Sequence, residues 1–352
     1  MQLPRTVVIC SFRLGGTDGV AVEAAKWATA FSSLGCAVRT VAGEGNADVL
    51  VPGLAAASPE PPGGAELAAA FAGSDLVVVE NLCSLPLNPG ASRAVADELA
   101  GRPAILHHHD LASQRSHLAH LGPPPDDPSW LHVCVNRRST AELNAYGYSA
   151  VTCHNCFSPD PAPGQRDETR ARAGVGTSER LVLQPTRAIA RKAVPAGLEL
   201  AERLGATYWL LGPAEDGYDD ELERTLSGAR VPVVRGRDAT RPGHVIEDAY
   251  AASDLVVLPS TWEGFGNPAI ESATHRRGLA IGPYPVGREL RGFGFAWFDV
   301  GSPDPLREWL AHPEESILEH NWSVARRYFS LDSLPTRIAR LVRRVASTIG
   351  SS

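Results

Sequence analysis

The sequence predicts an α/β protein with two domains, each built on a parallel sheet that helices cover on both faces. Two observations predict this architecture. Short, continuous apolar runs alternate with longer stretches of helical periodicity, and such runs are typical of strands that are buried on both faces. The chain has 352 residues, 43% hydrophobic and 21% charged, and this length suffices for two domains of about 150 residues each.

The first half of the chain begins with an expected strand at 6–10, a glycine-rich turn at 13–19 and a helix at 20–35. Apolar residues recur at helical spacing in this helix, and Gly35 is expected to end it. A connection rich in proline, glycine and alanine follows at 52–64. Further strands are expected at 37–43, 75–81, 103–110, 130–136 and 149–155.

The second half repeats this alternation after a stretch rich in proline and glycine, FSPDPAPGQ, where we expect a linker. Its strands are expected at 181–186, 206–212, 231–236 and 254–260. The last segment predicts an amphipathic helix with an arginine-rich face, which favours packing across the domains over membrane docking. The expected boundaries are 1–158 for the first domain, 159–178 for the linker, 179–325 for the second domain and 326–352 for a helix that crosses back to the first.

The net charge of the chain argues against some classes of function. A net charge of −7 argues against general binding to nucleic acids or membrane surfaces. The N-terminal segment becomes polar too soon for a signal peptide, and no apolar run approaches the ~20 residues of a membrane span. We therefore expect a cytoplasmic protein with no nucleic-acid partner and at most a peripheral association with membranes.

The six cysteines are scattered among mostly apolar neighbours, as expected of buried thiols in the cytoplasm. Cys153 and Cys156 form a C-x-x-C, which can be a redox pair or half of a zinc site. No second C-x-x-C or spaced histidine pair completes such a site. A strand end that enters the linker is the favoured interpretation, and the role of this pair stays open.

A basic pair follows the first strand of the second domain. Arg187 and Lys192 stand there as R-x4-K. Only two lysines, Lys26 and Lys192, occur in a chain that otherwise uses arginine, so this lysine is informative. Arginine offers a planar fork and lysine a point charge, which together suit a diphosphate at the end of a buried strand. A solvated helix start is the alternative.

The motif STWEGFGNPAIESA places two glutamates around a tight turn after the last expected strand. Asn267 is a good N-cap and Pro268 suits the first helical position, so Glu263 falls on the loop and Glu271 on the helix. The amides of Gly264, Phe265, Gly266 and Asn267 and the helix start predict an anion-binding turn. Two solvated acids beside a helix N-terminus are the alternative.

Polar residues also follow strands in the first domain. In HHHD, alternation along an extended strand directs His107 and His109 to one face and His108 to the other, which makes a three-histidine metal site improbable. His109 is the candidate to bond a sugar hydroxyl. Glu80 lies at another strand end. The remaining ligand-side candidates are Gly15 and Gly16, whose backbone can approach a ligand closely, and Arg13, Asn81, Asp110 and Arg115.

Taken together, these motifs resemble the GT-B-fold retaining glycosyltransferases of family 4. The resemblance rests on the Gly15-Gly16 turn, the strand-end His109-Asp110, the Arg187/Lys192 pair, and Glu263/Glu271 within PSTWEGFGNPAIE. It covers nearly the whole chain and is strongest at 181–283. It implies two Rossmann-like domains that face each other across a cleft, with the acceptor in the first and a nucleotide diphosphate sugar in the second.

The resemblance also implies residue roles. Arg187 and Lys192 would hold the donor diphosphate, Glu271 the ribose, and Glu263 the donor sugar, together with the amides of the turn. His109 would lie beside that sugar. The segment at 235–238, with Arg237, stands where the family contacts the base. The catalytic candidates are therefore His109, Glu263, Arg187 and Lys192, and the acceptor-side candidates are Arg13, Asn81, Asp110 and Arg115.

One departure from the family concerns the loop geometry. The glycine that usually follows the lysine is replaced by Ala193. The chain also lacks a D-x-D motif, a common way to hold a divalent metal under a nucleotide diphosphate. We therefore expect no metal and no other cofactor, with Arg187, Lys192 and loop amides supplying the charge.

The expected reaction is the retaining transfer of a hexosyl group to an alcohol, with no covalent nucleophile apparent in the sequence. A sugar-nucleotide epimerase of the same fold and a non-catalytic nucleotide-sugar-binding protein are the alternatives. A dehydrogenase is disfavoured because GGTDG is not G-x-G-x-x-G. The nucleotide base, the sugar, the acceptor, the linkage and the oligomeric state stay open.

Overall fold

The computed structural model describes residues 3–16, 18–116 and 118–349. The chain forms two compact units. Unit 1 holds residues 1–155 together with 332–352, and unit 2 holds residues 156–331. Among the described residues, no helix is both long and apolar enough to cross a membrane.

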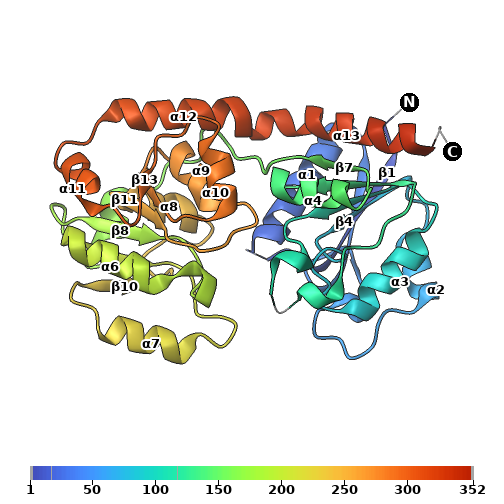
Figure 1. Cartoon of the computed structure of the whole chain (residues 1–352), viewed down its shortest axis with the longest axis horizontal. Coiled ribbons are helices and arrows are strands. Elements are labelled where there is room, and N and C mark those ends of the chain that lie inside the picture. Colours follow the sequence, from blue (N-terminus) through green and yellow to red (C-terminus); the bar gives the residue numbers. More distant parts are fainter. Residues whose placement is uncertain (1–2, 17, 117, 350–352) are drawn as a thin grey trace. The chain divides into compact units, whose positions relative to one another are not determined.

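Unit 1 is built on a parallel sheet in the order β3-β2-β1-β4-β5-β6-β7 (Figure 1). The central strand β1 pairs with β2 on one side and β4 on the other, which places a switch in strand order between β1 and β4. The expected strands are all present, and β1 runs further than expected, through Leu14. The strands in sheet order are β3 (Val49–Leu50), β2 (Ala37–Gly45), β1 (Thr6–Leu14), β4 (Leu76–Glu80), β5 (Ala104–His108), β6 (Trp130–Cys134) and β7 (Ala150–Thr152).

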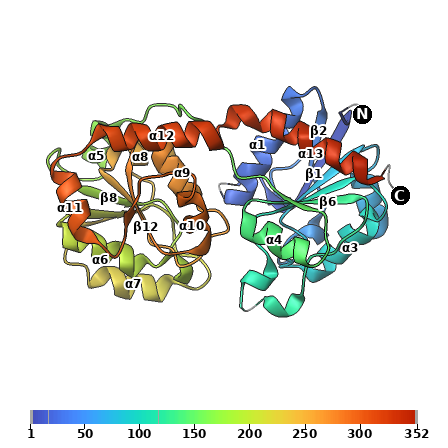
Figure 2. The same cartoon turned by 45° about the horizontal axis from the view of Figure 1, so that its top comes forward.

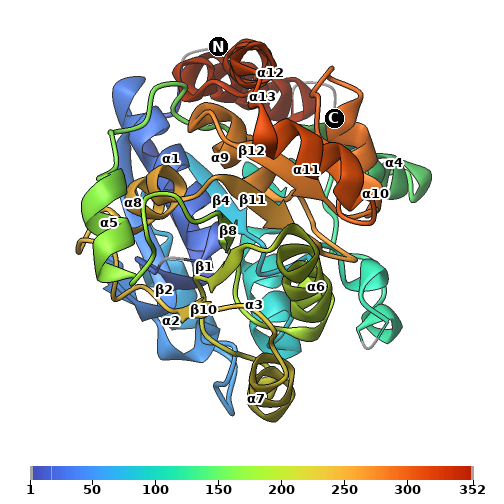
Figure 3. The same ribbon diagram turned by 90° about the vertical axis from the view of Figure 1, so that its left-hand side faces the viewer.

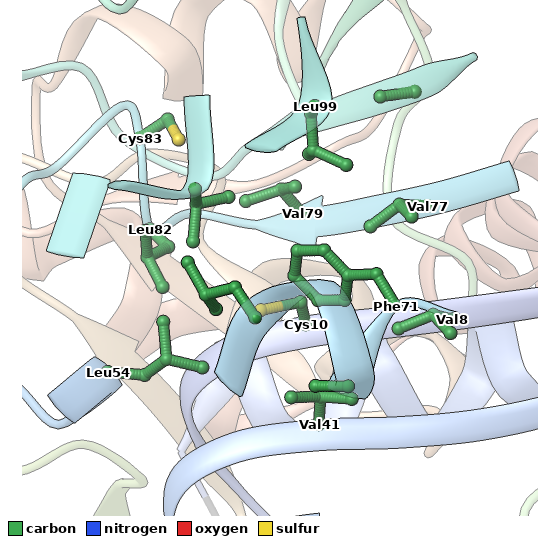
Figure 4. Packing of buried hydrophobic residues seen from close by; sticks show 14 of the residues in the cluster. Val8, Cys10, Val41, Leu54, Phe71, Val77, Val79, Leu82, Cys83 and Leu99 are labelled. Atoms are coloured by element: carbon green, nitrogen blue, oxygen red, sulfur yellow. The ribbon is translucent and has the colours of Figure 1, made fainter. Parts of the chain in front are cut away.

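Helices cover the two faces of this sheet. α2 and α3 lie over one face, where Leu67, Phe71 and Leu99 join strand residues such as Val8 and Val77 in a buried core (Figure 4). The other face carries α1, α4 and the C-terminal α13, which packs on α1 and β6. The chain therefore returns to unit 1 with its last helix. The helices are α1 (Gly19–Ser33), α2 (Gly64–Ala70), α3 (Pro89–Leu99), α4 (Arg137–Ala145) and α13 (Leu334–Ile349).

Unit 2 repeats the plan with the sheet order β10-β9-β8-β11-β12-β13. Figure 3 shows β8, β11 and β12 side by side in this sheet. The last two strands were not expected from the sequence, because LAI stands between Gly278 and Gly282 without a longer apolar run and FD has only two residues. The strands in sheet order are β10 (Val233–Arg235), β9 (Thr207–Leu210), β8 (Leu181–Gln184), β11 (Leu255–Leu258), β12 (Gly278–Ile281) and β13 (Phe298–Asp299).

The helices of unit 2 also form two layers (Figure 2). α6 packs against β9 and against α7 and α11, enclosing a core with Leu198, Tyr208 and Trp309. α8 and α9 lie against β8, β11 and β12, with α5 and α12 outside them. The helices are α5 (Arg166–Arg172), α6 (Val194–Leu204), α7 (Asp219–Ser227), α8 (Val245–Ala252), α9 (Asn267–Thr274), α10 (Pro285–Arg291), α11 (Pro303–Ala311) and α12 (Glu315–Phe329).

The expected domain boundaries need correction. Residues 159–178 are not a linker but part of unit 2, because α5 packs on α8. Arg166 bonds the carbonyls that end α8, and Arg170 is buried against Ala252 and Asp254. The expected C-terminal helix at 326–352 is divided between the units, since α12 ends at Phe329 in unit 2 and α13 begins at Leu334 in unit 1.

Candidate functional site

The sheet of unit 2 reverses its strand order between β8 and β11. Ligands of open α/β sheets bind at the carboxyl ends of the strands beside such a switch. The loops at these strand ends carry the residues that the sequence singled out. Lys192 ends a short 3₁₀ turn (Ala190–Lys192) after β8, and Glu263 lies on the loop after β11.

Lys192 and Glu263 form a buried ion pair. The distance from Nζ of Lys192 to Oε1 of Glu263 is 2.5 Å, and the residues are only 8% and 5% exposed. Ser260 donates to the same oxygen at 2.6 Å. Burial alone would raise the pKa of Glu263, but the charges of Lys192 and Arg191 and the hydrogen bonds from Lys192 and Ser260 outweigh it, so the pKa is lowered. Glu263 is therefore a carboxylate at neutral pH.

Arg191 is a member of this cluster that the sequence reasoning missed. Its Nη1 lies 3.0 Å from Oε2 of Glu263 and 2.9 Å from the carbonyl oxygen of Trp262. The carbonyl of Arg191 in turn accepts from the amide of Thr261 at 2.9 Å. The loops after β8 and β11 are thus joined by side chains and backbone. The excess of arginine in the chain hid this residue, because no spacing rule distinguishes it from a solvated side chain.

The backbone of Lys192 is fixed by a hydrogen bond from Gln184, and the chain turns at Ala193. Gln184, at the end of β8, donates to the carbonyl of Lys192 at 3.1 Å and accepts from the hydroxyl of Tyr208 at 2.7 Å. Ala193 has a left-handed conformation, φ 48° and ψ 52°, before α6 begins. Ala193, which stands where the family has a glycine, thus adopts a conformation that glycine reaches without strain. Alanine takes the strained geometry at a cost of roughly 1–2 kcal/mol.

Arg187 follows β8 but pairs with another residue. Its Nη1 lies 2.5 Å from Oε2 of Glu215, and both side chains are more than a third exposed. Such an exposed pair contributes only about 0–1 kcal/mol, so an anionic ligand could replace Glu215 at little cost. Arg187 still raises the positive potential at Lys192, since its charge helps to lower the pKa of Lys192, after the larger effect of burial.

The turn after Glu263 is tightly packed. Gly266 has φ 95°, and a Cβ at this position would lie 2.2 Å from the hydroxyl oxygen of Tyr284. Phe265 is buried and stacks on Phe157. The N-cap of α9 is Gly266 rather than the expected Asn267, which is already the first helical residue. The left-handed conformation explains this shift, because it directs the chain into the helix one residue earlier.

The other predicted residues of unit 2 lie at the same edge of the sheet. Glu271, in the first turns of α9, accepts from the hydroxyl of Tyr250 at 2.9 Å and is only partly buried. Gly264 is buried in the turn. Arg237 follows β10 and is exposed. The structure therefore brings Lys192 and Glu263 into direct contact and leaves Arg187 and Arg237 on neighbouring loops.

In unit 1, β4 and β5 end in a buried cluster of one carboxylate and two imidazoles. Oε2 of Glu80 lies 2.9 Å from Nδ1 of His107 and 2.8 Å from Nε2 of His109. Burial alone would raise the pKa of Glu80, but the charges and hydrogen bonds of both histidines lower it to about 2. His107 and His109 share one face of β5, as alternation predicted, whereas His108 on the opposite face contacts His132 at 2.8 Å.

These three side chains are also of the types that bind metals. Their ligand atoms lie within 4.8 Å of one another. Two of the three separations are hydrogen-bond distances, shorter than the about 3.3 Å between ligand atoms of a tetrahedral zinc site. Metal-bound histidines usually bond a second residue through their other nitrogen, but Nε2 of His107 is buried with no such partner among the described residues. The geometry therefore fits a hydrogen-bonded cluster better than a metal site.

Asn81 fixes the backbone of the loop that carries His109 and Asp110. It has a left-handed φ of 59°, and its Oδ1 accepts from the amides of His109 and Asp110 and from the hydroxyl of Ser84. This arrangement makes Asn81 a support for the loop, so its expected role as a contact to the acceptor gains no support.

The remaining candidates of unit 1 pair with one another or shape the turn after β1. Arg115 and Asp110 form an ion pair at 2.9 Å, and the exposed Arg13 lies 3.3 Å from Asp18, the N-cap of α1. Gly15 has φ 73°, and a Cβ there would meet Asn46 at 2.5 Å. Gly16 follows it before the start of α1. Arg13 itself is the penultimate residue of β1 rather than part of the turn.

Comparison with known proteins supports the resemblance. No protein-family model matches the chain. It is 24% identical over 328 residues to the mannosylglucosylglycerate synthase of Thermotoga maritima, covering 76% of each chain. The protein of the same name from Petrotoga mobilis is also 24% identical, over 278 residues, covering 65% of this chain and 64% of that protein.

Solved structures share the fold along nearly the whole chain. HepE of Anabaena in complex with UDP and glucose has a TM-score of 0.69 and 17% identity, covering 97% of this chain and all of that one. The sucrose-phosphate synthase of Thermosynechococcus elongatus has a TM-score of 0.72 and 12% identity, covering 97% and 99%. The predicted α/β architecture with two Rossmann-like domains is thus confirmed, and the fold is that of the GT-B glycosyltransferases.

Proposed function

We propose that this protein is a retaining glycosyltransferase that moves a hexosyl group from a nucleotide diphosphate sugar to an alcohol. The observation that carries the proposal is the buried cluster of Lys192, Arg191 and Glu263 at the switch point of unit 2. The relatives that are named as synthases of a glycoside, and solved neighbours of the same fold that bind UDP and UDP-glucose, support it.

The donor diphosphate binds at the basic loop after β8 in this proposal. Nζ of Lys192 has three N–H groups, and among the described residues Glu263 takes one of them. Two donors are left for phosphate oxygens. Arg187 adds a planar fork once it leaves Glu215, and the N-terminus of α9 adds a partial positive charge. These groups balance the charge of the leaving diphosphate without requiring a metal ion.

The two glutamates have separate tasks in this proposal. A carboxylate has about four lone-pair sites, and Lys192, Ser260 and Arg191 occupy three of those on Glu263. The remaining site, on Oε2, accepts a hydroxyl of the transferred sugar. Glu271 accepts from the ribose hydroxyls, since it lies in the first turns of α9 and is only partly buried. Neither glutamate acts as a covalent nucleophile.

The reaction follows from this arrangement. The bond from the anomeric carbon to the diphosphate breaks first, and preorganised cations stabilise the departing phosphate oxygen. The acceptor hydroxyl then attacks from the face that the diphosphate leaves, and the leaving phosphate takes its proton. Configuration at the anomeric carbon is retained. In unit 1, His109 is the proposed hydrogen-bonding group for a sugar hydroxyl.

The names of the relatives indicate which acceptors to test first. Both are synthases of mannosylglucosylglycerate, a product that contains a mannosyl group, a glucosyl group and glycerate. We therefore include glycosides of glycerate as the first acceptors to test, with mannose as the first transferred sugar.

Transfer can be tested with UDP-, GDP- and ADP-linked hexoses and a panel of acceptors that includes glucosylglycerate. Thermal shift identifies the donor, because a ligand that binds only the folded state raises the unfolding temperature. Mass spectrometry then detects the new glycoside, and NMR of its anomeric proton reports the configuration. Conversion of the donor alone into another nucleotide sugar would indicate an epimerase, and binding without turnover a non-catalytic protein.

The residue assignment is tested with Lys192→Ala. We expect a loss of about 2–4 kcal/mol of transition-state stabilisation, or about 30- to 1,000-fold in kcat/KM. Arg203→Ala is the matched control, because it removes a cation from α6 whose partner Glu199 is exposed. Unchanged turnover in Lys192→Ala would contradict the assignment.

A further inference from the structure

Glu80 accepts two hydrogen bonds on a single oxygen, and the two histidines that donate them differ in their surroundings. His107 is 1% exposed, packs against Trp27 with ring centroids 4.3 Å apart, and buries its second nitrogen, Nε2, without a partner among the described residues. His109 is 8% exposed, and its second nitrogen, Nδ1, is not buried in this way. Of the two rings, only that of His109 can therefore reach a ligand.

The bond to Glu80 decides which nitrogen of His109 is available. Since the carboxylate is an acceptor, Nε2 of His109 must carry the proton that points to it. The ring cannot turn over without losing this bond. Its main chain is held as well, because Oδ1 of Asn81 accepts the amide of His109 at 3.0 Å. Both the position and the orientation of the imidazole are thus set by residues at the end of β4.

We propose that Glu80 is a positioning residue for His109: it holds the Nε2–H inward, so that His109 presents a charged Nδ1–H to a hydroxyl oxygen of a sugar bound at the end of β5. The identity of the ligand in this inference rests on the proposed glycosyltransferase function. The protonation state of the His109 imidazole does not. Glu80 touches no ligand in this arrangement and acts through His109 alone.

The charges around His109 agree with an imidazolium. Burial alone would lower the pKa of His109, but the hydrogen bond to Glu80 and the charges of Glu80, Glu23 and Asp110 raise it overall. Glu23 comes from α1, where Lys26 lies 2.5 Å from it, and Asp110 is paired with Arg115. His107, from β5, is the other titratable group in direct contact. Among the residues that the structure describes, Glu80 is therefore the one acid that bonds the ring itself.

The wild-type protein provides the first test and needs no substrate. Long-range ¹H–¹⁵N spectra of ¹⁵N-histidine-labelled protein distinguish the protonation of Nδ1 from that of Nε2, and the spectrum of His109→Gln assigns the signal. We expect Nε2 of His109 to stay protonated across the titration, with Nδ1 losing its proton. A neutral ring protonated at Nδ1 alone would overturn the proposal.

Glu80→Gln provides the second test, since it keeps the shape of Glu80 and removes its charge. We expect the titration of His109 to move down by about one pH unit or more. Asp126→Asn is the control, because Asp126 bonds His132 of β6, which contacts His108 rather than His109, and this change should leave the titration of His109 in place. An unshifted titration in Glu80→Gln would overturn the proposal.

Kinetics separate this proposal from the proposed function. In Glu80→Gln, the loss of transfer activity at alkaline pH should begin about one pH unit lower, and affinity should fall for the nucleotide sugar but not for the nucleoside diphosphate. Equal weakening of both ligands would indicate a general structural role and overturn the proposal. If the wild type transfers no sugar, the NMR titrations still decide the relation between Glu80 and His109.

Discussion

Lys192 and Glu263 join the ends of the two strands between which the sheet of unit 2 reverses its order. Nζ and Oε1 are 2.5 Å apart, and both side chains are buried. Removing one partner of a buried pair leaves the other charge without compensation, which typically costs about 3–5 kcal/mol. The pair is therefore structural as well as functional, and variants of it must be tested for folding before their activity is interpreted.

Arg191→Lys should weaken donor binding without unfolding the protein. Lysine keeps the charge beside Glu263 but lacks the planar guanidinium fork, of which Nη1 contacts both Glu263 and the carbonyl of Trp262. We expect about a tenfold rise in the Kd of the nucleotide sugar, about 1.4 kcal/mol, measured by calorimetry. The control is Arg230→Lys, which alters an exposed arginine that pairs with Glu202. Equal affinities of Arg191→Lys and wild type would show that the fork is dispensable.

Gly266→Ala should distort the turn between Glu263 and α9. The added Cβ would lie 2.2 Å from the hydroxyl oxygen of Tyr284, and the residue would also keep φ at 95°. Gly294→Ala carries the same conformational penalty at φ 106°, but its Cβ would meet no atom within 4 Å. We expect Gly266→Ala to lower both activity and the unfolding temperature by more than Gly294→Ala does.

A second change isolates the clash in this turn. Adding Tyr284→Phe to Gly266→Ala removes the clashing oxygen and should recover part of the lost stability. If the double variant is no more stable than Gly266→Ala, contact with the hydroxyl is not the cause of the defect.

Ala193→Gly should stabilise the protein or leave its stability unchanged. Glycine adopts φ 48° without the strain that alanine has there, but it also gains entropy in the unfolded chain. The two effects nearly offset, and we expect a net gain of about 0–1 kcal/mol in the free energy of unfolding. Ala196→Gly, in the first turns of α6, should instead cost about 0.5–1 kcal/mol. Denaturant unfolding measures both, and similar losses would argue against strain at Ala193.

The contribution of Glu80 to stability should depend on pH. Its pKa falls from the ordinary 4.5 to about 2 in the folded protein. A lowered carboxylate pKa stabilises the fold fully above the unfolded pKa, and this contribution is lost as the pH falls from about 4.5 towards about 2. The stability difference between wild type and Glu80→Gln should therefore be largest above pH 5 and shrink towards pH 3. Urea unfolding at several pH values checks this, and a constant difference would contradict it.

The fold could be predicted because its signals are local. The apolar runs of the strands, the periodicity of α1 and the glycine at position 35 each depend on a few neighbouring residues. β12 was missed because glycines border its short apolar run, and β13 because it has only two residues. The linker was misplaced because proline and glycine are typical of connections between domains, whereas Arg166 and Arg170 attach the adjoining α5 to the end of α8.

The sequence by itself determined which residues follow the strands and which charges they carry: Lys192, Arg187, Glu263 and Glu271, and the alternation that separates His108 from His109. Only the tertiary structure decided which of the charged and polar side chains pair with one another. It paired Arg191 with Glu263 and Arg187 with Glu215. It also brought Glu80 within hydrogen-bond distance of both His107 and His109. The physical reason is that parallel strands bring their carboxyl ends to one edge of a sheet, so the partners are set by strand order and not by separation along the chain.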